Sequence, residues 1–253
     1  MYRIIGLLPL LLILLGPQTR ADSLPDLIDR IRPGIVGVGT IQKTRRPPNR
    51  LLGTGFAIAD GSLIATNAHV IPLEMNSKRR EFLAVFIGRG KEARGRRATV
   101  LAMDRQHDVT ILKMEGPPLP ALPLGDPRVA REGEAIAFTG FPIGAILGLY
   151  PVTHIGIISA LTPIVIPARS SHELTAEQIH FLRHPFQVFQ LDATAYPGNS
   201  GSPMYNRTTG KVIGIINMVF VKGKKENVLK DPSAISYAIP IDYLKALLKQ
   251  LRD

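Results

Sequence analysis

Hydrophobic and polar residues alternate along most of the chain in short runs, and this pattern predicts strands. Asp60 and Gly61 lie between two such runs and predict a two-residue hairpin turn. Six short strands at this spacing predict a small closed barrel, which we place at about residues 34–115. The predicted strands of this set cover residues 34–41, 51–59, 62–66, 82–87, 98–103 and 109–114.

A proline-rich stretch, residues 116–127, follows the first set of strands. Proline cannot donate to the hydrogen-bond ladder of a central strand, so this stretch predicts a connector that divides the chain. A second set of short apolar runs follows it and predicts a second barrel at about residues 132–240. The strands of this set are predicted at residues 135–139, 152–159, 186–193, 201–205, 212–221 and 234–239.

Helical spacing of apolar residues occurs close to both ends. Residues 24–31 predict a short helix that ends before Pro33 and Gly34, and residues 241–252 predict an amphipathic closing helix. Between two strands of the second set, residues 162–183 form a long excursion. Within it, residues 175–178 have the pattern of a capping box and predict a short helix.

The first residues have the pattern of an export signal. Arg3 precedes twelve uncharged, mostly apolar residues, and the sequence around Ala21 offers a small-residue cleavage site. We therefore expect a signal peptide at residues 1–21, cleaved after Ala21, and a single domain at residues 22–253 in the periplasm or outside the cell. The alternative is a membrane anchor formed by an uncleaved signal, but the apolar run falls short of the roughly 20 residues that span a bilayer.

Composition narrows the function classes. The chain has no cysteine, which excludes disulfides, a thiol nucleophile and thiolate metal sites. The net charge is +11, and basic residues cluster at 43–46, 78–80 and 94–97. These basic loops could bind an anionic envelope surface, or they could serve only as solvated connections between strands. No aromatic residues interleave with them, so nucleic acid is not an expected partner. Neither a histidine pair at metal-binding spacing nor a phosphate-binding glycine loop is present, so we expect no metal and no cofactor.

Three distant segments together carry the groups of a nucleophilic site. His69 follows a predicted strand, Asp108 opens another, and Ser200 lies in the turn sequence Gly198-Asn199-Ser200-Gly201. A serine hydroxyl needs a base to attack at neutral pH, and imidazole serves best when a carboxylate fixes its tautomer. The backbone N–H groups of Gly198 and Ser200 could form an oxyanion hole. His69 and Asp108 fall in the first barrel and Ser200 in the second, so the site would assemble between the barrels.

These segments resemble the trypsin-like fold, and most closely the HtrA (Deg) family of serine proteases. Further matching blocks are Gly53-Thr54-Gly55-Phe56, Gly140-Phe141-Pro142-Ile143-Gly144 and Tyr237-Ala238-Ile239-Pro240. The resemblance implies an all-β fold of two six-stranded antiparallel β-barrels, a trypsin-like double barrel with a short N-terminal and a C-terminal helix. It also implies that His69 is the general base, Asp108 the orienting carboxylate and Ser200 the nucleophile.

Two features depart from the family pattern. Ser202 stands where the family usually has a second glycine after the nucleophile, and the chain ends at Asp253, so we expect no PDZ domain. The resemblance places the substrate pocket near the nucleophile, without a carboxylate, so we expect it to accept small aliphatic residues. The residues assigned to this pocket are Thr194, Ala195, Ile215, Ile216, Asn217 and Met218.

The function expected from these features is a serine endopeptidase that hydrolyses exported or unfolded polypeptides through an acyl-enzyme. The alternatives are a protease-fold binding protein or chaperone with a latent or regulated site, and an esterase. By the resemblance, residues 162–183 would sense an activator, but a plain surface insertion is an equally good interpretation. We expect structural roles for the other histidines, and the sequence indicates no oligomeric state. These histidines are His107, His154, His172, His180 and His184.

Overall fold

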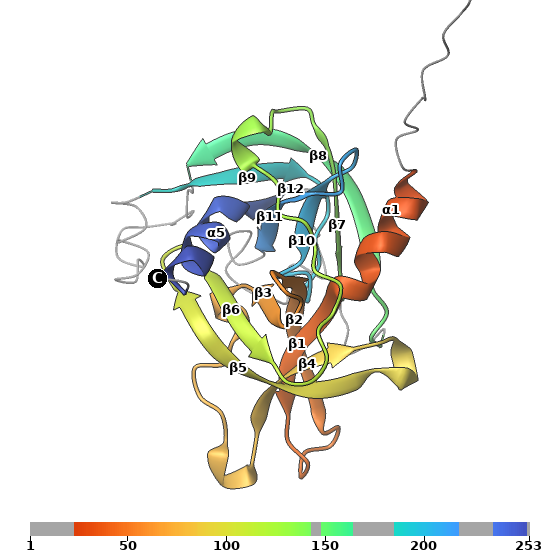
Figure 1. The fold of residues 1–253 in the computed structure, drawn as a ribbon, viewed down its shortest axis with the longest axis vertical. Coiled ribbons are helices and arrows are strands. Elements are labelled where there is room, and N and C mark those ends of the chain that lie inside the picture. The colour runs from red at the N-terminus through yellow and green to blue at the C-terminus, as the bar shows by residue number, and fades with distance from the viewer. Residues whose placement is uncertain (1–22, 143–147, 164–184, 218–234, 252–253) are drawn as a thin grey trace, which may run out of the picture.

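The computed structural model describes residues 23–142, 148–163, 185–217 and 235–251. Two closed six-stranded antiparallel barrels pack against each other, as the sequence predicts (Figure 1). The first barrel has the strand order β1-β2-β3-β6-β5-β4 and the second β10-β11-β12-β9-β8-β7. The strands of the first are β1 (Ile35–Ile41), β2 (Asn49–Ile58), β3 (Leu63–Thr66), β4 (Phe82–Ile87), β5 (Arg94–Asp104) and β6 (Val109–Met114). Those of the second are β7 (Ala135–Gly140), β8 (Val152–Pro163), β9 (Gln187–Asp192), β10 (Pro203–Asn206), β11 (Val212–Asn217) and β12 (Ile235–Pro240).

Strand β5 begins at Arg94, four residues before the predicted start. The sequence analysis missed this start because three of the first four residues are arginines, which gave no hydrophobic pattern. Arg97 lies opposite Ala84 of β4, and its guanidinium carbon sits 4.1 Å from the centre of the Phe82 ring. Long cationic side chains can cover apolar surface with their stems while the charge stays in water. A basic stretch is therefore compatible with a strand at this position.

The predicted two-residue turn at Asp60 and Gly61 is wrong. Ile58 pairs with Leu63, so the connection between β2 and β3 runs over residues 59–62. The Gly61 N–H donates to the Ile58 carbonyl at 2.9 Å, which closes a turn over Ala59 and Asp60. Asp60 Oδ1 also accepts hydrogen bonds from the Ser62 N–H (3.0 Å) and hydroxyl (2.6 Å). The side chain of Asp60 thereby stabilises a longer loop than the turn motif predicts.

Both predicted helices are confirmed. Helix α1 (Leu24–Ile31) begins after Ser23, whose Oγ accepts a hydrogen bond from the Asp26 N–H, and it buries Leu27 and Ile31. Helix α5 (Ile241–Gln250) follows β12 and packs against β6 of the first barrel. Among the described residues, no helix is long and apolar enough to cross a membrane. Residues 1–21 and the predicted capping box lie outside the described residues.

One hydrophobic core joins the two barrels. Phe56 and Ile111 of the first barrel belong to the same buried cluster as Val188, Tyr205 and Ile215 of the second. Two further clusters fill the barrels, one in each. Burial of apolar side chains from both halves in one core fixes their relative position. This shared core therefore sets the geometry of any site between the barrels.

Candidate active site

His69 and Asp108 form a close pair at one end of the first barrel. His69 lies in the turn after β3, and its Nδ1 is 2.6 Å from Oδ2 of Asp108. The His69 backbone N–H also donates to Oδ1 of Asp108 at 2.8 Å. An ionised carboxylate only accepts hydrogen bonds, so this contact places the proton of a neutral imidazole on Nδ1. Nε2 is then left with a lone pair that can accept a proton.

The backbone around Asp108 is held in an uncommon conformation. Asp108 has a φ of 54°, in the left-handed region that few residues other than glycine adopt. Its carbonyl accepts hydrogen bonds from the side-chain amide of Asn67 (3.0 Å) and from the Ala68 N–H (3.2 Å). These bonds link the start of β6 to the turn that carries His69. The pair is thus fixed through both its side chains and its backbone.

Asn217 contributes to this pair from the second barrel. Its side chain is fully buried, and Nδ2 donates to Oδ2 of Asp108 at 2.6 Å. The sequence assigned Asn217 to the wall of the substrate pocket, whereas the structure directs its amide to the carboxylate. In the sequence, Asn217 directly follows the apolar run of β11, and a buried asparagine needs a polar partner. This was the only signal in the sequence for the contact.

Ser200 lies in a compact turn and is 6% exposed. The Asn199 N–H donates to the Tyr196 carbonyl at 2.9 Å, and Gly198 within this turn has a φ of 101°. Proline followed by a glycine of positive φ is the pattern of a type II turn, so Gly198 is required here. The next turn continues through Gly201, which also has a positive φ of 87°.

Thr54 of β2 holds this turn from the first barrel, a role that the sequence analysis missed. Its backbone N–H donates to the Ser200 carbonyl at 2.8 Å, and its hydroxyl donates to the Gly198 carbonyl at 2.7 Å. The same hydroxyl accepts a hydrogen bond from the Phe141 N–H at 3.0 Å. With both carbonyls held on Thr54, the Gly198–Asn199 and Ser200–Gly201 peptide groups cannot rotate freely.

The structure brings the turn that carries His69 and the turn that carries Ser200 against the same residue of β2, Gly53. A Cβ atom added to Gly53 would lie 2.7 Å from Val70, the neighbour of His69, and 2.9 Å from the Ser200 carbonyl oxygen. This close approach explains the glycine beside Thr54. Among the described residues, no hydrogen bond links the Ser200 hydroxyl to His69. Catalytic hydrogen bonds are often long in ligand-free enzymes and tighten when substrate binds.

The remaining pocket residues have varied surroundings. Ala195 is buried, and its N–H donates to the Ser236 hydroxyl at 3.1 Å. Thr194 is half-buried, and Ile215 and Ile216 are fully buried within hydrophobic clusters. Met218 lies outside the described residues. The extent of the substrate pocket therefore stays a prediction.

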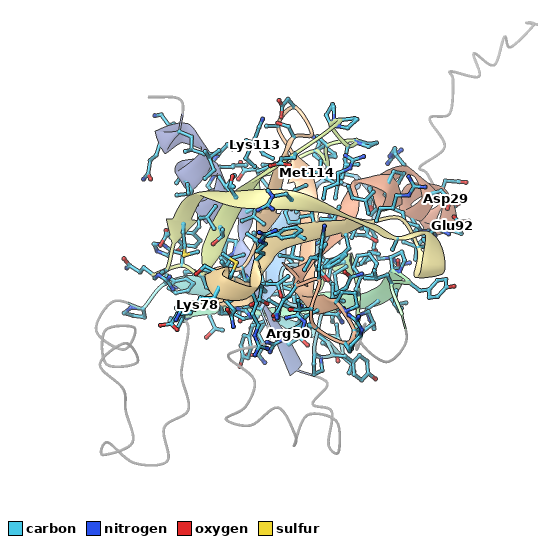
Figure 2. The ribbon with its side chains drawn as sticks, turned by 90° about the horizontal axis from the view of Figure 1, so that it is seen from below. Asp29, Arg50, Lys78, Glu92, Lys113 and Met114 are labelled. Carbon is cyan, nitrogen blue, oxygen red and sulfur yellow. The ribbon has the colours of Figure 1, made fainter. Side chains whose placement is uncertain are left out.

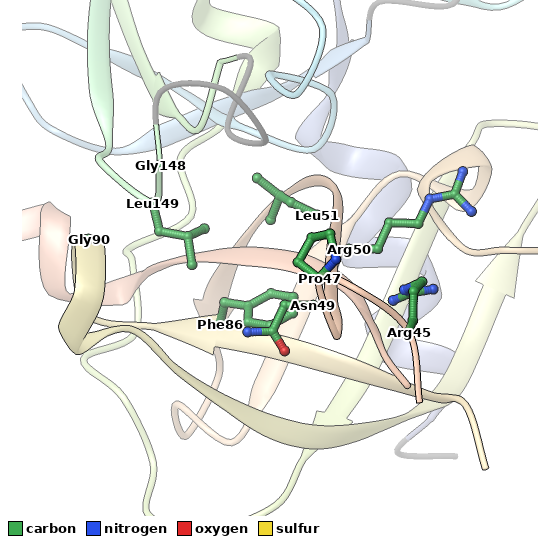
Figure 3. A pocket seen from close by; sticks show the side chains of 9 residues that line it. All are labelled: Arg45, Pro47, Asn49, Arg50, Leu51, Phe86, Gly90, Gly148 and Leu149. Carbon is green, nitrogen blue, oxygen red and sulfur yellow. The ribbon is translucent and has the colours of Figure 1, made fainter. Parts of the chain in front are cut away.

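A pocket of about 380 Å³ lies between strands and loops of the first barrel and the segment Gly148-Leu149, which precedes β8 of the second (Figure 3). None of the three predicted catalytic residues lines it. Its apolar walls include Leu51, Phe86 and Leu149, and Arg45 at its edge is paired with Glu81 at 2.7 Å. The lining includes no nucleophile, carboxylate or histidine, so this pocket is not the candidate active site.

Two of the other histidines lie in the described part of the chain. His107 bonds Asp104 at 2.6 Å and stacks on Tyr243 of α5 at 4.0 Å, which is the structural role expected of it. His154 instead lies beside the Ser200 turn, with its Nε2 3.4 Å from Nδ2 of Asn199. No group of three or more His, Asp or Glu side chains among the described residues is placed to hold a metal ion.

Known proteins resemble this chain in sequence and in fold. A probable periplasmic DegP-like serine endoprotease of Halomonas elongata is 32% identical over 81% of this chain and 36% of its own length. Serine protease HTRA3 of Homo sapiens is 29% identical over 94% of this chain and 47% of its own length. Mitochondrial serine protease HTRA2 of Bos taurus is 29% identical over 92% of this chain and 44% of its own length. The chain thus spans less than half the length of each of these relatives.

A solved HtrA-type protease, an AlgW variant with a tripeptide, shares the fold with a TM-score of 0.63. It is 22% identical, and the match covers 91% of this chain and 64% of the solved chain. The family of trypsin-like peptidase domains matches residues 53–215 of this chain, which include His69, Asp108 and Ser200. The chain belongs to the trypsin-like peptidase domain family, and its relatives are HtrA-type serine proteases.

Proposed function

We propose that this protein is a serine endopeptidase with Ser200 as nucleophile, His69 as general base and Asp108 as the carboxylate that orients His69. The observation that carries this proposal is the 2.6 Å contact between His69 Nδ1 and Asp108, which leaves Nε2 to act as the base. The Ser200 turn, fixed on Thr54, supplies the second half of the site. Membership of the trypsin-like family supports the same assignment.

The proposed reaction proceeds through an acyl-enzyme. The Ser200 hydroxyl oxygen attacks the scissile carbonyl carbon while His69 Nε2 takes the hydroxyl proton. The carbonyl oxygen becomes an oxyanion that the N–H groups of Gly198 and Ser200 receive. Collapse of this intermediate breaks the C–N bond, and His69 gives its proton to the leaving amine. Water then attacks the ester with the help of the same base and releases the free acid and Ser200. Asp108 stays ionised throughout.

The proposed substrates are exported or unfolded polypeptides. Support for the substrate class comes from the relatives, which are named as serine endoproteases or serine proteases. One relative is named as periplasmic and another as mitochondrial, so our proposal for the cell compartment rests on the apolar run of this chain's own sequence. We propose export to the periplasm or the exterior on that basis.

Binding of the basic loops to an anionic surface is a separate part of the proposal. Lys78 and Arg50 project from one edge of the molecule in Figure 2, and both side chains are exposed. Several other basic groups already have partners in the chain: Arg45 bonds Glu81, and Arg96 donates to the Pro117 carbonyl at 2.6 Å. Sedimentation with vesicles of anionic lipid, compared with neutral vesicles, tests whether the exposed groups suffice.

A digest of casein, run beside a simple ester substrate, tests the enzymatic proposal. We expect hydrolysis of casein by the protein and none by the Ser200→Ala or His69→Ala variant. The losses should not add in the double variant, because the two residues act as one unit. Cleavage of the ester alone would indicate an esterase. No turnover of either substrate would indicate a binding protein with a latent site.

The cleavage preference is a second prediction. Neither residues 193–199 nor the end of β11 offers a carboxylate to pair with a basic substrate side chain. We therefore expect digestion of a peptide library to show small or medium aliphatic residues before the scissile bond. Dominant cleavage after lysine or arginine would contradict this and would indicate that Asp192 reaches the pocket.

A further inference from the structure

Asn199 stands between the two residues proposed to supply the oxyanion hole, and it is fully buried. Its N–H donates to the Tyr196 carbonyl and its own carbonyl accepts from the Ser202 N–H, both at 2.9 Å. Any tilt of Asn199 therefore moves the peptide groups of Gly198 and Ser200. The contacts of the Asn199 side chain consequently decide how firmly the turn is held.

The imidazole of His154 faces this side chain from β8. Its Nε2 lies 3.4 Å from Nδ2 of Asn199. The ring stacks on Phe138 with centroids 4.8 Å apart and planes at 20°, and it lies 5.9 Å from the Tyr196 ring. These contacts leave the imidazole little freedom to turn. A neutral imidazole with its proton on Nδ1 can accept a hydrogen bond from the Asn199 amide.

The oxygen of the Asn199 amide lies near the hydroxyl of Ser202. Asn199 Oδ1 and the Ser202 hydroxyl are both buried without a hydrogen-bond partner among the described residues. Both oxygens border one point, because a Cβ atom added to Gly140 would lie 2.9 Å from Asn199 Oδ1 and 2.0 Å from Ser202 Oγ. An unpaired buried polar atom costs about 1–3 kcal/mol. The Thr54 hydroxyl, 2.8 Å from the same point, is already bonded to Gly198 and Phe141, so a hydrogen bond from the Ser202 hydroxyl to Oδ1 is the pairing that would satisfy both atoms.

We propose that His154 and Ser202 hold the Asn199 amide between them and thereby act as positioning residues for the oxyanion turn. This role rests on the proposed peptidase function, and neither residue touches the substrate. The sequence supports a role specific to this chain, because Ser202 replaces the glycine usual at its position. The described neighbours of the His154 ring are Phe138, Tyr196 and Asn199, and Tyr196 is the only other titratable group among them.

The proton state of His154 matters for this arrangement. An imidazolium has two donors and no acceptor, so protonation deprives the Asn199 Nδ2 of its partner. The amide must then turn, and its oxygen leaves Ser202. Burial lowers the pKa of His154, which keeps the ring neutral and the arrangement intact near neutral pH.

Steady-state kinetics of two His154 variants test the role in turnover. His154→Phe keeps the stacking on Phe138 but removes both nitrogens, whereas His154→Gln keeps a group that can accept from the amide. We expect kcat of His154→Phe to fall about 10- to 100-fold with KM nearly unchanged, because a misplaced oxyanion donor weakens the transition state alone. His154→Gln should recover most of that loss. Thr153 is next to His154, but its hydroxyl contacts Thr139. The control variant Thr153→Val should therefore leave kcat unchanged.

A nuclear magnetic resonance titration of His154 tests the contact without using activity. In a Ser200→Ala background, Asn199→Asp puts a carboxylate beside the imidazole and should raise the titration midpoint of His154 by about one pH unit or more. An unchanged midpoint would overturn the proposed contact, and full activity of His154→Phe would overturn the positioning role. A shifted midpoint in a protein whose unmodified form hydrolyses no peptide would refute the proposed function while supporting the contact.

Discussion

The hydroxyl of Thr54 carries two hydrogen bonds that a methyl group of the same shape cannot make. Thr54→Val would leave the Gly198 carbonyl and the Phe141 N–H unpaired, at about 1–3 kcal/mol for each buried group. We expect a kcat about 10- to 100-fold lower, because the turn that carries the proposed oxyanion donors loses its side-chain hydrogen bond to the first barrel and keeps only the bond to the Thr54 backbone N–H. Thermal unfolding and steady-state kinetics of the variant measure both effects.

Thr110→Val is a matched control for this substitution. Thr110 is a fully buried threonine in the same barrel, and its hydroxyl has no hydrogen-bond partner among the described residues. Removal of an unpaired hydroxyl is expected to be neutral or stabilising. Equal losses of activity in the two variants would contradict a specific role for Thr54.

Gly140 lies so close to Ser202 that residue 140 has no room for a side chain unless residue 202 becomes smaller. A Cβ atom at residue 140 would lie 2.0 Å from the Ser202 hydroxyl, so Gly140→Ala should destabilise the protein. Ser202→Gly removes the atom in the closest contact and should restore part of the lost stability. The double-mutant cycle is measured by urea unfolding. Additive effects would show that the overlap is relieved in another way.

At the residue scale, the sequence supports a prediction where the chemistry is carried by residue type and local pattern. His69, Asp108 and Ser200 stand out because their segments have the order and composition that the chemistry needs. The contacts of Thr54, Asn217 and His154 were missed, because each joins segments that are far apart in the chain. A buried polar side chain signals that a partner exists but does not identify that partner.

At the scale of elements, Glu81 ties the start of β4 to β1 and to the loop after it. Its carboxylate accepts from the Thr40 hydroxyl and from Arg45, both at 2.7 Å, and from the Asn76 N–H at 3.1 Å. The Thr40 hydrogen bond is the main cause of a lowered pKa for Glu81, followed by the Asn76 N–H. A depressed acid pKa stabilises the fold above the pKa of the unfolded chain, and this stabilisation is lost as pH falls through the folded value.

Glu81→Gln should therefore destabilise the protein near neutral pH and much less in acid. We expect the difference in unfolding free energy between the protein and this variant to shrink as pH falls below about 4.3, the ordinary glutamate value. Urea unfolding at a series of pH values measures this difference. A difference that stays constant down to acid pH would mean that the carboxylate charge contributes nothing to the fold.

The prediction of helices and strands was accurate where the hydrophobic spacing is strong, and it failed where polar or charged residues occupy the end of a strand or a connection. Helix α1 occupies the residues predicted for it, because buried Leu27 and Ile31 have helical spacing and Ser23 caps the start. The early start of β5 was missed because its arginines read as a loop. The prediction for the β2–β3 connection was wrong because the residue types at Asp60 and Gly61 mark a turn but do not show that strand pairing stops at Ile58 and Leu63.

At the scale of the whole molecule, each barrel supplies a side chain that holds the part of the candidate site carried by the other barrel. Asn217 of the second barrel bonds Asp108 in the first, and Thr54 of the first holds the Ser200 turn in the second. The sequence predicted two barrels but not which apolar residues face across the boundary. Phe56 and Ile215 have the same strand pattern as residues that point into a single barrel, so only the fold identifies them as shared core.

This mutual dependence predicts that the site and both barrels are lost together. Chains longer than about 150 residues often unfold in stages, but a core that spans both barrels favours one transition here. We expect the labelling of Ser200 by a serine-directed phosphonate and the far-ultraviolet circular dichroism to decline with a common urea midpoint. Asn217→Ala should lower that midpoint for both signals, because it removes the amide from a buried carboxylate. Loss of labelling at lower urea than the loss of strand signal would show instead that the barrels separate before they unfold.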